Sequence, residues 1–135
     1  MKLIPKPGPF RLPLGDRGEA AAWEFLKKQG YDLVEKNYHC KLGEIDVIAR
    51  RAGRIAFIEV KTRTSDHYGA PQEAVNLVKQ EKIFKIASWY LKEKKLSGTP
   101  VAFDVISVLW KEGQPPEIKL ILDAFEKGED RGGRS

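Results

Sequence analysis

Residues 43–63 constrain the fold more than any other part of the chain, because they read as two β-strands folded about Ala52-Gly53. A turn of two residues and a turn of four residues centred on this point predict the same pairing of the strands. In that pairing Asp46 lies opposite Glu59, with the two Cβ atoms roughly 5 Å apart, and like charges placed in this way repel one another. The hairpin therefore needs something that offsets the repulsion.

The alternation of side chains along a strand predicts which other residues surround the two carboxylates. On the first strand, Glu44 shares a face with Asp46 and lies opposite Lys61. On the second strand, Glu59 shares a face with Lys61 and Arg63. Either a divalent cation or Lys61 would offset the repulsion between the carboxylates, and the hairpin by itself does not choose between them.

The chain has the size and composition of one soluble globular domain. It has 135 residues, of which 41% are hydrophobic and 32% are charged, enough to bury a single core. Cys40 is the only cysteine, which excludes an internal disulfide and favours a reducing compartment. No apolar run approaches the roughly 18 residues of a membrane span, and the N-terminus lacks the apolar stretch of a signal peptide. We expect a cytoplasmic protein, and its net charge of +5 favours a polyanionic partner.

The predicted elements follow the order αβββαββ, which indicates an α/β domain with one mixed sheet flanked by helices. The prolines of residues 1–13 predict an extended or disordered N-terminal arm. The domain is predicted to span 14–126, and the polar, Gly-rich residues 127–135 to form a flexible tail. Outside the hairpin, strands are predicted at 31–38, 101–110 and 118–122.

The first predicted helix is capped by Asp16 and ends at Gly30. Glu19 lies in line with the apolar residues of one helix face, which are Ala22, Trp23 and Leu26. An acid that faces inward costs free energy unless it is paired or bound to a metal. The alternative is that Glu19 only lies near the helix N-terminus, where the helix dipole favours acids.

The second predicted helix spans 71–95, opens at Pro71, and either continues through Asn76 or is broken there. Its periodicity predicts one apolar face. The residues of that face are Val75, Val78, Ile83, Ile86, Ala87, Tyr90 and Leu91.

The hairpin acids indicate metal-assisted chemistry. Asp46 and Glu59 offer hard oxygen ligands that suit Mg²⁺ or Mn²⁺, and such an ion assists the hydrolysis of phosphodiesters. Lys61 would orient the attacking water or stabilise the developing negative charge. The residues alone leave a second interpretation open, in which this strand face is exposed and Glu44 and Lys61 form a surface ion pair of little energetic value.

Several separated motifs resemble known nucleases. Asp46, followed by Glu59-Val60-Lys61 after an apolar strand, resembles the PD-(D/E)xK signature of restriction-endonuclease-like enzymes, and Glu19 resembles the first acid of Holliday-junction resolvases. Over roughly residues 14–125 the chain resembles the YraN-type family of small predicted endonucleases. The residues that carry this resemblance are Gly18-Glu19, Gly30-Tyr31, Asn37, Gly43-Glu44-Ile45-Asp46, Phe57-Ile58-Glu59-Val60-Lys61-Thr62-Arg63, Gly69, Lys79, Phe103-Asp104 and Ala124-Phe125.

The resemblance implies a restriction-endonuclease-like fold and a nuclease that uses Mg²⁺ or Mn²⁺. By position, Glu19, Asp46 and Glu59 would be catalytic acids and metal ligands. Lys61 would be the catalytic lysine. Ile45 stands before Asp46 where the signature has a proline, which weakens the match to the signature but leaves the chemical groups in place.

The same resemblance implies that the partner is a nucleic acid, above all DNA and including branched or structured forms, and that no membrane is involved. Cutting both strands of a duplex would suggest a homodimer. The alternatives are a catalytically silent nucleic-acid-binding module on the same fold, and a scaffold protein whose charged residues form only ion pairs. The expected substrate-binding residues are Glu44, Arg63, Gln80, Lys79 and Arg50.

Overall fold

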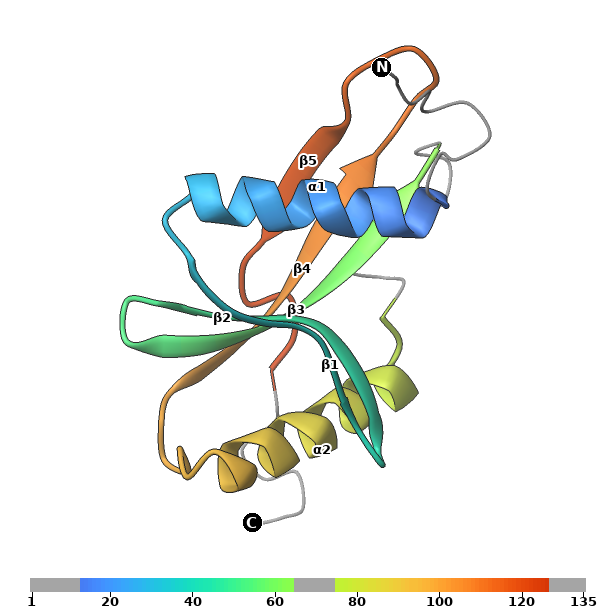
Figure 1. The fold of residues 1–135 in the computed structure, drawn as a ribbon. Helices are drawn as coiled ribbons and strands as arrows, with labels where there is room; N and C mark the ends of the chain where they lie inside the picture. Colours follow the sequence, from blue (N-terminus) through green and yellow to red (C-terminus); the bar gives the residue numbers. More distant parts are fainter. Residues whose placement is uncertain (1–12, 65–74, 127–135) are drawn as a thin grey trace, which may run out of the picture.

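The architecture is a five-stranded sheet flanked by two helices (Figure 1). The computed structural model describes residues 13–64 and 75–126, so the predictions for 1–12, for Pro71 and for 127–135 lie outside the described residues. The elements, in chain order, are α1 (Leu14–Lys28), β1 (Asp32–Cys40), β2 (Gly43–Arg51), β3 (Arg54–Arg63), α2 (Leu77–Glu93), β4 (Val101–Leu109) and β5 (Glu117–Ile121). This order confirms the predicted αβββαββ arrangement. No helix of the described residues is long and apolar enough to cross a membrane.

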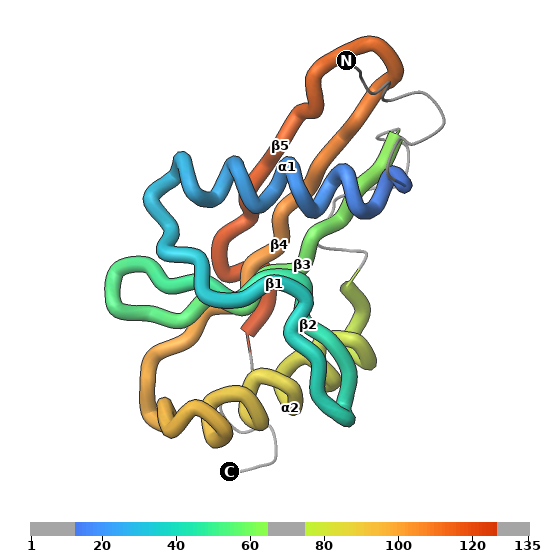
Figure 2. The backbone as a smooth tube through the Cα atoms, viewed as in Figure 1, coloured from blue at the N-terminus to red at the C-terminus, as the bar shows by residue number. Residues whose placement is uncertain are grey.

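The strands lie across the sheet in chain order, β1-β2-β3-β4-β5. Neighbouring strands are antiparallel except for β3 and β4, which are parallel. A parallel pair needs a crossover connection, and the connection that contains α2 supplies it. The backbone trace shows α1 and α2 on opposite sides of the strands (Figure 2). Because both faces are covered, β3 is buried on both faces over most of its length, as the unbroken apolar run from Ile55 to Ile58 predicts.

Each helix packs on its own apolar cluster. On the α2 side, the rings of Phe57 and Phe103 stack with their centroids 5.6 Å apart, and Phe84 meets Phe103 edge-on at 4.8 Å. On the α1 side, Ala22 and Leu26 are fully buried against aliphatic residues of β2, β3 and β4. These two clusters fix both helices against the strands that carry the hairpin acids.

The predicted hairpin is confirmed, with a turn of two residues. Strands β2 and β3 pair in the predicted register as far as Val47–Ile58. Ala52 and Gly53 join them with φ angles of 54° and 78°, as in the type I′ turns that suit the twist of a hairpin. Gly53 adopts this left-handed conformation freely, whereas the side chain of Ala52 makes it less favourable.

The start of α1 differs from the prediction, whereas the start of α2 agrees with one of the two predicted alternatives, a break at Asn76. α1 begins before Asp16, which therefore lies in its first turn and does not cap it. α2 begins after Asn76, whose side chain caps it by accepting a hydrogen bond from the Lys79 amide at 2.9 Å. Val78 is 79% exposed, so its predicted place on the apolar face is wrong. The physical reason is that the first turn of α2 extends past the packed part of the helix, whose buried residues begin at Ile83.

Asp104 is a buried acid for which the sequence suggests no role. It is 1% exposed, and its carboxylate accepts a hydrogen bond from the Asp123 amide at 2.8 Å. The Asp123 carboxylate in turn pairs with Arg54 at 3.1 Å. Asp104 thus ties the turn after β5 to β4, and Asp123 extends the link to Arg54 beside the hairpin turn, which gives the buried carboxylate of Asp104 a structural partner.

Gly18 allows α1 to approach β3 closely. A Cβ at this position would lie 1.8 Å from Thr62 Oγ1 and 2.8 Å from Thr62 Cβ. Gly18→Ala is therefore expected to lower the free energy of unfolding by about 2 kcal/mol through overpacking. Gly15→Ala in the same helix is the matched control, because nothing lies within 4 Å of a Cβ there, and it should be neutral or stabilising. Urea unfolding measures both, and equal stabilities of the two variants would contradict the close approach.

Candidate active site

The two hairpin strands separate where they carry the acids. The β2–β3 ladder stops at Val47–Ile58, so the predicted ladder pair of Asp46 with Glu59 does not form. Asp46 instead turns its carboxylate towards β3, where Oδ2 accepts a hydrogen bond from the Val60 amide at 2.8 Å. The opened ladder leaves the two carboxylates close enough for the charge of one to affect the other.

Glu59 is held in the interior with only part of its charge satisfied. Glu59 is only 4% exposed. Lys79 of α2 forms an ion pair with it, with Lys79 Nζ 3.3 Å from Glu59 Oε1. Glu59 Oε2 is buried and has no hydrogen-bond partner among the described residues. Buried carboxylate oxygens normally have a partner, so this atom marks the place of a further donor or cation.

Burial is the largest of the effects that raise the pKa values of both carboxyls. The pKa of Glu59 is raised to about 7, first by burial and then by the charge of Asp46, against the lowering effect of Lys79. Burial also raises the pKa of Asp46, although the hydrogen bond from Val60 and the charge of Lys79 oppose the rise. A divalent cation beside both groups would relieve this cost, and perturbed acids of this kind are typical of functional sites.

Two lysines from different elements share the site. Burial and the neighbouring Lys79 lower the pKa of Lys61 on β3. Burial also lowers the pKa of Lys79, but the charge of Glu59 and the hydrogen bond to it outweigh burial, so the net pKa is raised. Lys79 therefore makes the direct ion pair with the carboxylate, while Lys61 holds its proton less tightly.

A second polar group lies on the α1 side of Asp46. Asn37 of β1, with its amide oriented to donate, places its nitrogen 3.0 Å from Glu44 Oε2 and 3.2 Å from Glu19 Oε1. Glu44 thus faces Asn37, and its predicted pairing with Lys61 is wrong because the ladder ends before that position. Burial raises the pKa of Glu19, and the charges of Asp46 and Glu44 raise it further. Glu19 contributes negative charge to the surroundings of Asp46 from a separate element.

Asn37 is the site residue that sequence reasoning did not assign. The β1–β2 pairs on either side of it place it across from Asp46, and its φ is 54°. A signal was present, because asparagine is depleted in strands and is one of the few residues that tolerate the left-handed region.

Three of the predicted substrate-binding residues lie apart from the carboxylates. Gln80 donates a hydrogen bond from its side-chain amide to the Val75 carbonyl at 2.9 Å, which ties the first turn of α2 to the residue before its cap. Arg50 is exposed near the hairpin turn, about 13 Å along β2 from Asp46 by the rise of a strand. Arg63 is half-buried at the end of β3. Any contact of these residues with a substrate stays a prediction.

The carboxylates suit a metal ion that uses few protein ligands. Within 13–64 and 75–126, no group of three or more His, Cys, Asp or Glu side chains is arranged to hold an ion. Mg²⁺ commonly takes one or two carboxylates and completes its shell with waters and phosphate oxygens. Asp46 and Glu59 supply two carboxylates, and the unpartnered Glu59 Oε2 is an oxygen that an ion would satisfy.

Comparison with known proteins identifies the family. The model of uncharacterised protein family UPF0102 matches residues 18–108, which is more than half of the chain. The chain belongs to UPF0102. This membership confirms the resemblance to the YraN-type family.

The chain is similar to UPF0102 proteins of several bacteria over most of their length. One from Geotalea uraniireducens is 46% identical over 113 residues, which cover 84% of this chain and 89% of the relative. One from Syntrophus aciditrophicus is 47% identical over 115 residues, covering 85% and 90%. One from Clostridium acetobutylicum is 44% identical over 113 residues, covering 83% and 93%.

The UPF0102 match contains every residue assembled at this site, from Glu19 on α1 to Lys79 on α2. Because UPF0102 is an uncharacterised family, its name assigns no activity. The chemistry has to be argued from the side chains of the site.

Proposed function

We propose that this protein is a metal-dependent nuclease that hydrolyses phosphodiester bonds of nucleic acid, with DNA as the expected substrate. The observation that carries the proposal is the pair Asp46 and Glu59, which are held together on diverging strands while Glu59 Oε2 is buried without a partner among the described residues. A cluster with only a structural role would gain nothing from such an oxygen, because an incompletely paired buried charge is costly.

Asp46 and Glu59 would hold Mg²⁺ or Mn²⁺, with Glu19 supporting the site from α1. The hydrogen bond from Val60 fixes one oxygen of Asp46, which limits the directions in which the carboxylate can turn. When bound, such an ion neutralises charge on phosphate oxygens and makes a nearby water more acidic. Carboxylate oxygens favour these hard cations over metals that prefer thiolates.

Lys61 would act on the water that attacks the phosphorus. Its lowered pKa makes the exchange of a proton with that water easier than it is for an exposed lysine. Lys79 would balance the charge of Glu59, and both lysines would stabilise the negative charge that develops on the phosphate. Each of these roles uses a side chain already positioned by β3 or α2.

The competing function is a catalytically silent nucleic-acid-binding module on the same fold. It would retain binding in EDTA and would cut no linear, branched or single-stranded DNA or RNA. The functional side chains at Glu19, Asp46, Glu59 and Lys61 favour the nuclease. The described residues form one such site, so we propose that cutting both strands of a duplex takes two copies of the chain.

Calorimetric titration of Mn²⁺ tests the proposal without knowledge of the substrate. The wild type is expected to bind Mn²⁺, and Asp46→Asn is expected to bind it at least about 10-fold more weakly. Loss of a residue that only supports a metal ligand already lowers metal affinity by about that factor. Asparagine can still accept the hydrogen bond from Val60. In EDTA the variant is expected to melt at a higher temperature than the wild type, because it removes a charge that repels Glu59.

Asp16→Asn is the control, since Asp16 is an exposed acid in the first turn of α1 and its loss should leave Mn²⁺ affinity unchanged. Suppose instead that neither the wild type nor Asp46→Asn binds Mn²⁺, and that the substitution leaves the melting temperature unchanged or lowers it. Asp46 is then a structural residue and the proposal fails. The titration is repeated with single-stranded DNA present, so that Mn²⁺ binding that requires the substrate is also detected.

A further inference from the structure

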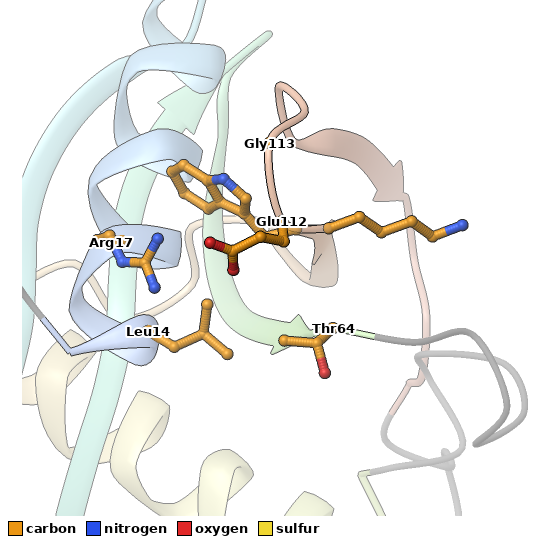
Figure 3. A pocket seen from close by; sticks show the side chains of 7 residues that line it. Leu14, Arg17, Thr64, Glu112 and Gly113 are labelled. Carbon is orange, nitrogen blue, oxygen red and sulfur yellow. The ribbon is translucent and has the colours of Figure 1, made fainter.

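A polar cavity lies beside α1, and none of the residues that line it is one of the carboxylates described above (Figure 3). Its volume is about 360 Å³. The residues that define it are Leu14 and Arg17 of α1, Thr64 after β3, and Trp110, Lys111 and Glu112 after β4. None of them takes part in the hydrolysis proposed above.

The cavity and the carboxylates are built on the same two elements. Gly18 separates Arg17 from Glu19 on α1, and it packs directly against Thr62 of β3. The end of β4 is held to the same strand, since the Trp110 amide donates a hydrogen bond to the carbonyl of the last β3 residue at 2.8 Å. The two sites therefore have fixed positions relative to one another.

The separation of the two sites suits a nucleic-acid strand. Thr64 follows Glu59 by five residues, which is at most about 16 Å along an extended chain. Phosphates of one strand in a duplex are about 3.4 Å apart along the axis. A strand whose phosphodiester lies at Glu59 would therefore reach the cavity with a nucleotide only a few positions away.

Arg17 provides the main recognition group of the cavity. Its guanidinium lies over the Trp110 ring, 5.1 Å from the ring centroid, and Figure 3 shows the guanidinium directed into the cavity. Unpaired bases stack on aromatic rings and on guanidinium planes. The Thr64 hydroxyl and the exposed Lys111 are of the types that contact sugar and phosphate oxygens.

Glu112 limits which part of a nucleotide enters the cavity. Figure 3 shows its carboxylate turned towards Arg17. A carboxylate repels a phosphate but accepts hydrogen bonds from the N–H groups of bases, including the ring N3–H of thymine. The charges therefore favour a base inside, between Arg17 and Glu112, with its phosphate outside near Lys111.

We propose that this cavity, which we call the Arg17–Trp110 pocket, binds one unpaired nucleotide of a strand whose backbone reaches the carboxylates. Its volume is at the small end of the range of about 300–1,000 Å³ for ligand pockets, which admits a single base with its sugar and excludes a double helix. The inference rests on the proposed nuclease function and narrows its substrate to nucleic acid with an unpaired stretch beside the cut.

Fluorescence anisotropy in EDTA tests the pocket in the absence of cleavage. The probes are a fluorescein-labelled oligothymidylate of eight nucleotides and a labelled duplex of sixteen base pairs. Arg17→Ala is expected to weaken binding of the oligothymidylate about 10-fold, as for the loss of one stacked base. Its effect on the duplex should be less than about twofold, because a paired base cannot enter the pocket.

Three further variants separate stacking from charge. Arg17→Lys keeps the charge but loses the planar group, so it should also weaken binding of the oligothymidylate. Lys111→Ala should remove about one phosphate contact. The slope of the logarithm of the binding constant against the logarithm of salt concentration should then become less steep by about 0.7 for a single strand. Lys85→Ala, an exposed residue of α2, is the matched control and should bind both probes as the wild type does.

The pocket is overturned if Arg17→Ala and Lys111→Ala bind the oligothymidylate as the wild type does. It is also overturned if they weaken binding of both probes equally, since that result indicates a general basic surface. These outcomes are independent of the Mn²⁺ titration. A protein that loses Mn²⁺ in Asp46→Asn but is insensitive to Arg17→Ala keeps the nuclease proposal and loses only the pocket. The reverse result keeps the nucleotide pocket and removes the hydrolysis.

Discussion

Replacing Lys61 by methionine is expected to slow phosphodiester cleavage by about 10³-fold, within the range for loss of a positioned acid or base, while Mn²⁺ affinity changes little. Methionine preserves most of the length and apolar bulk of the side chain but can neither exchange a proton nor carry charge. Lys61 keeps its proton less tightly than an exposed lysine because of burial and the neighbouring Lys79. Initial cleavage rates on labelled DNA with an unpaired stretch, at saturating Mn²⁺, measure the effect.

Lys119→Met is the matched control for this experiment. Ser107 of β4 pairs with Lys61 on one side and with Lys119 on the other, so the control lysine is two strands further from the carboxylates, and it is exposed. Its loss should leave the rate within about threefold, as expected for one phosphate contact at moderate salt. Normal cleavage by Lys61→Met would show that another group activates the water.

Replacing Glu59 by glutamine is expected to stabilise the metal-free protein at pH 8 by about 1–3 kcal/mol, while it abolishes Mn²⁺ binding. Burial and the charge of Asp46 hold the pKa of Glu59 at about 7, against an ordinary value of 4.5. The ionised carboxylate therefore costs the folded state free energy that the neutral amide does not. Urea unfolding in EDTA measures the difference between variant and wild type.

The dependence of this difference on pH gives a second check. Below pH 4.5 the Glu59 carboxyl is protonated in both the folded and the unfolded protein, so it contributes no difference in stability. Between pH 4.5 and about 7 the unfolded state has released this proton and the folded state has not, so the free energy of unfolding falls as pH rises. Above that window the loss is constant.

Glu59→Gln should lack this fall, so its advantage over the wild type should grow from pH 4.5 to pH 8. Glu117→Gln, at an exposed position of β5, is the control and should follow the wild type. If Glu59→Gln is instead less stable than the wild type at pH 8, the ion pair with Lys79 outweighs the burial of the charge. The carboxylate would then be a stabilising structural group.

The elements of this fold could be predicted because they depend on residues that are neighbours in the chain. The Ala52-Gly53 turn gave the register of the hairpin as far as Val47–Ile58. The apolar run from Ile55 to Ile58 indicated a strand covered on both faces, and β3 is such a strand. The prediction for Val78 was wrong because periodicity describes which residues share a helix face, but not where along the helix the packing begins.

The candidate site could be predicted only in part. Asp46, Glu59 and Lys61 could be predicted because all three lie on one hairpin. In a hairpin, the spacing of residues along each strand determines which side chains share a face. Lys79 and Gln80 are both among the predicted substrate-binding residues, and only packing shows that Lys79, rather than Gln80, reaches Glu59. In sequence terms the two residues are adjacent, but successive residues of a helix point in directions about 100° apart.

By itself, the sequence determined the αβββαββ order, the hairpin about Ala52-Gly53 and the presence of two carboxylates and a lysine on adjacent strands, because each of these follows from local periodicity and turn chemistry. Only the tertiary structure decided that the ladder opens at Asp46, which turns a predicted cross-strand repulsion into a carboxylate bonded to the Val60 amide. It also decided that Asn37 joins Glu19 to Glu44. These contacts link β1, β2, β3 and α1, and their geometry depends on how separate elements pack against one sheet.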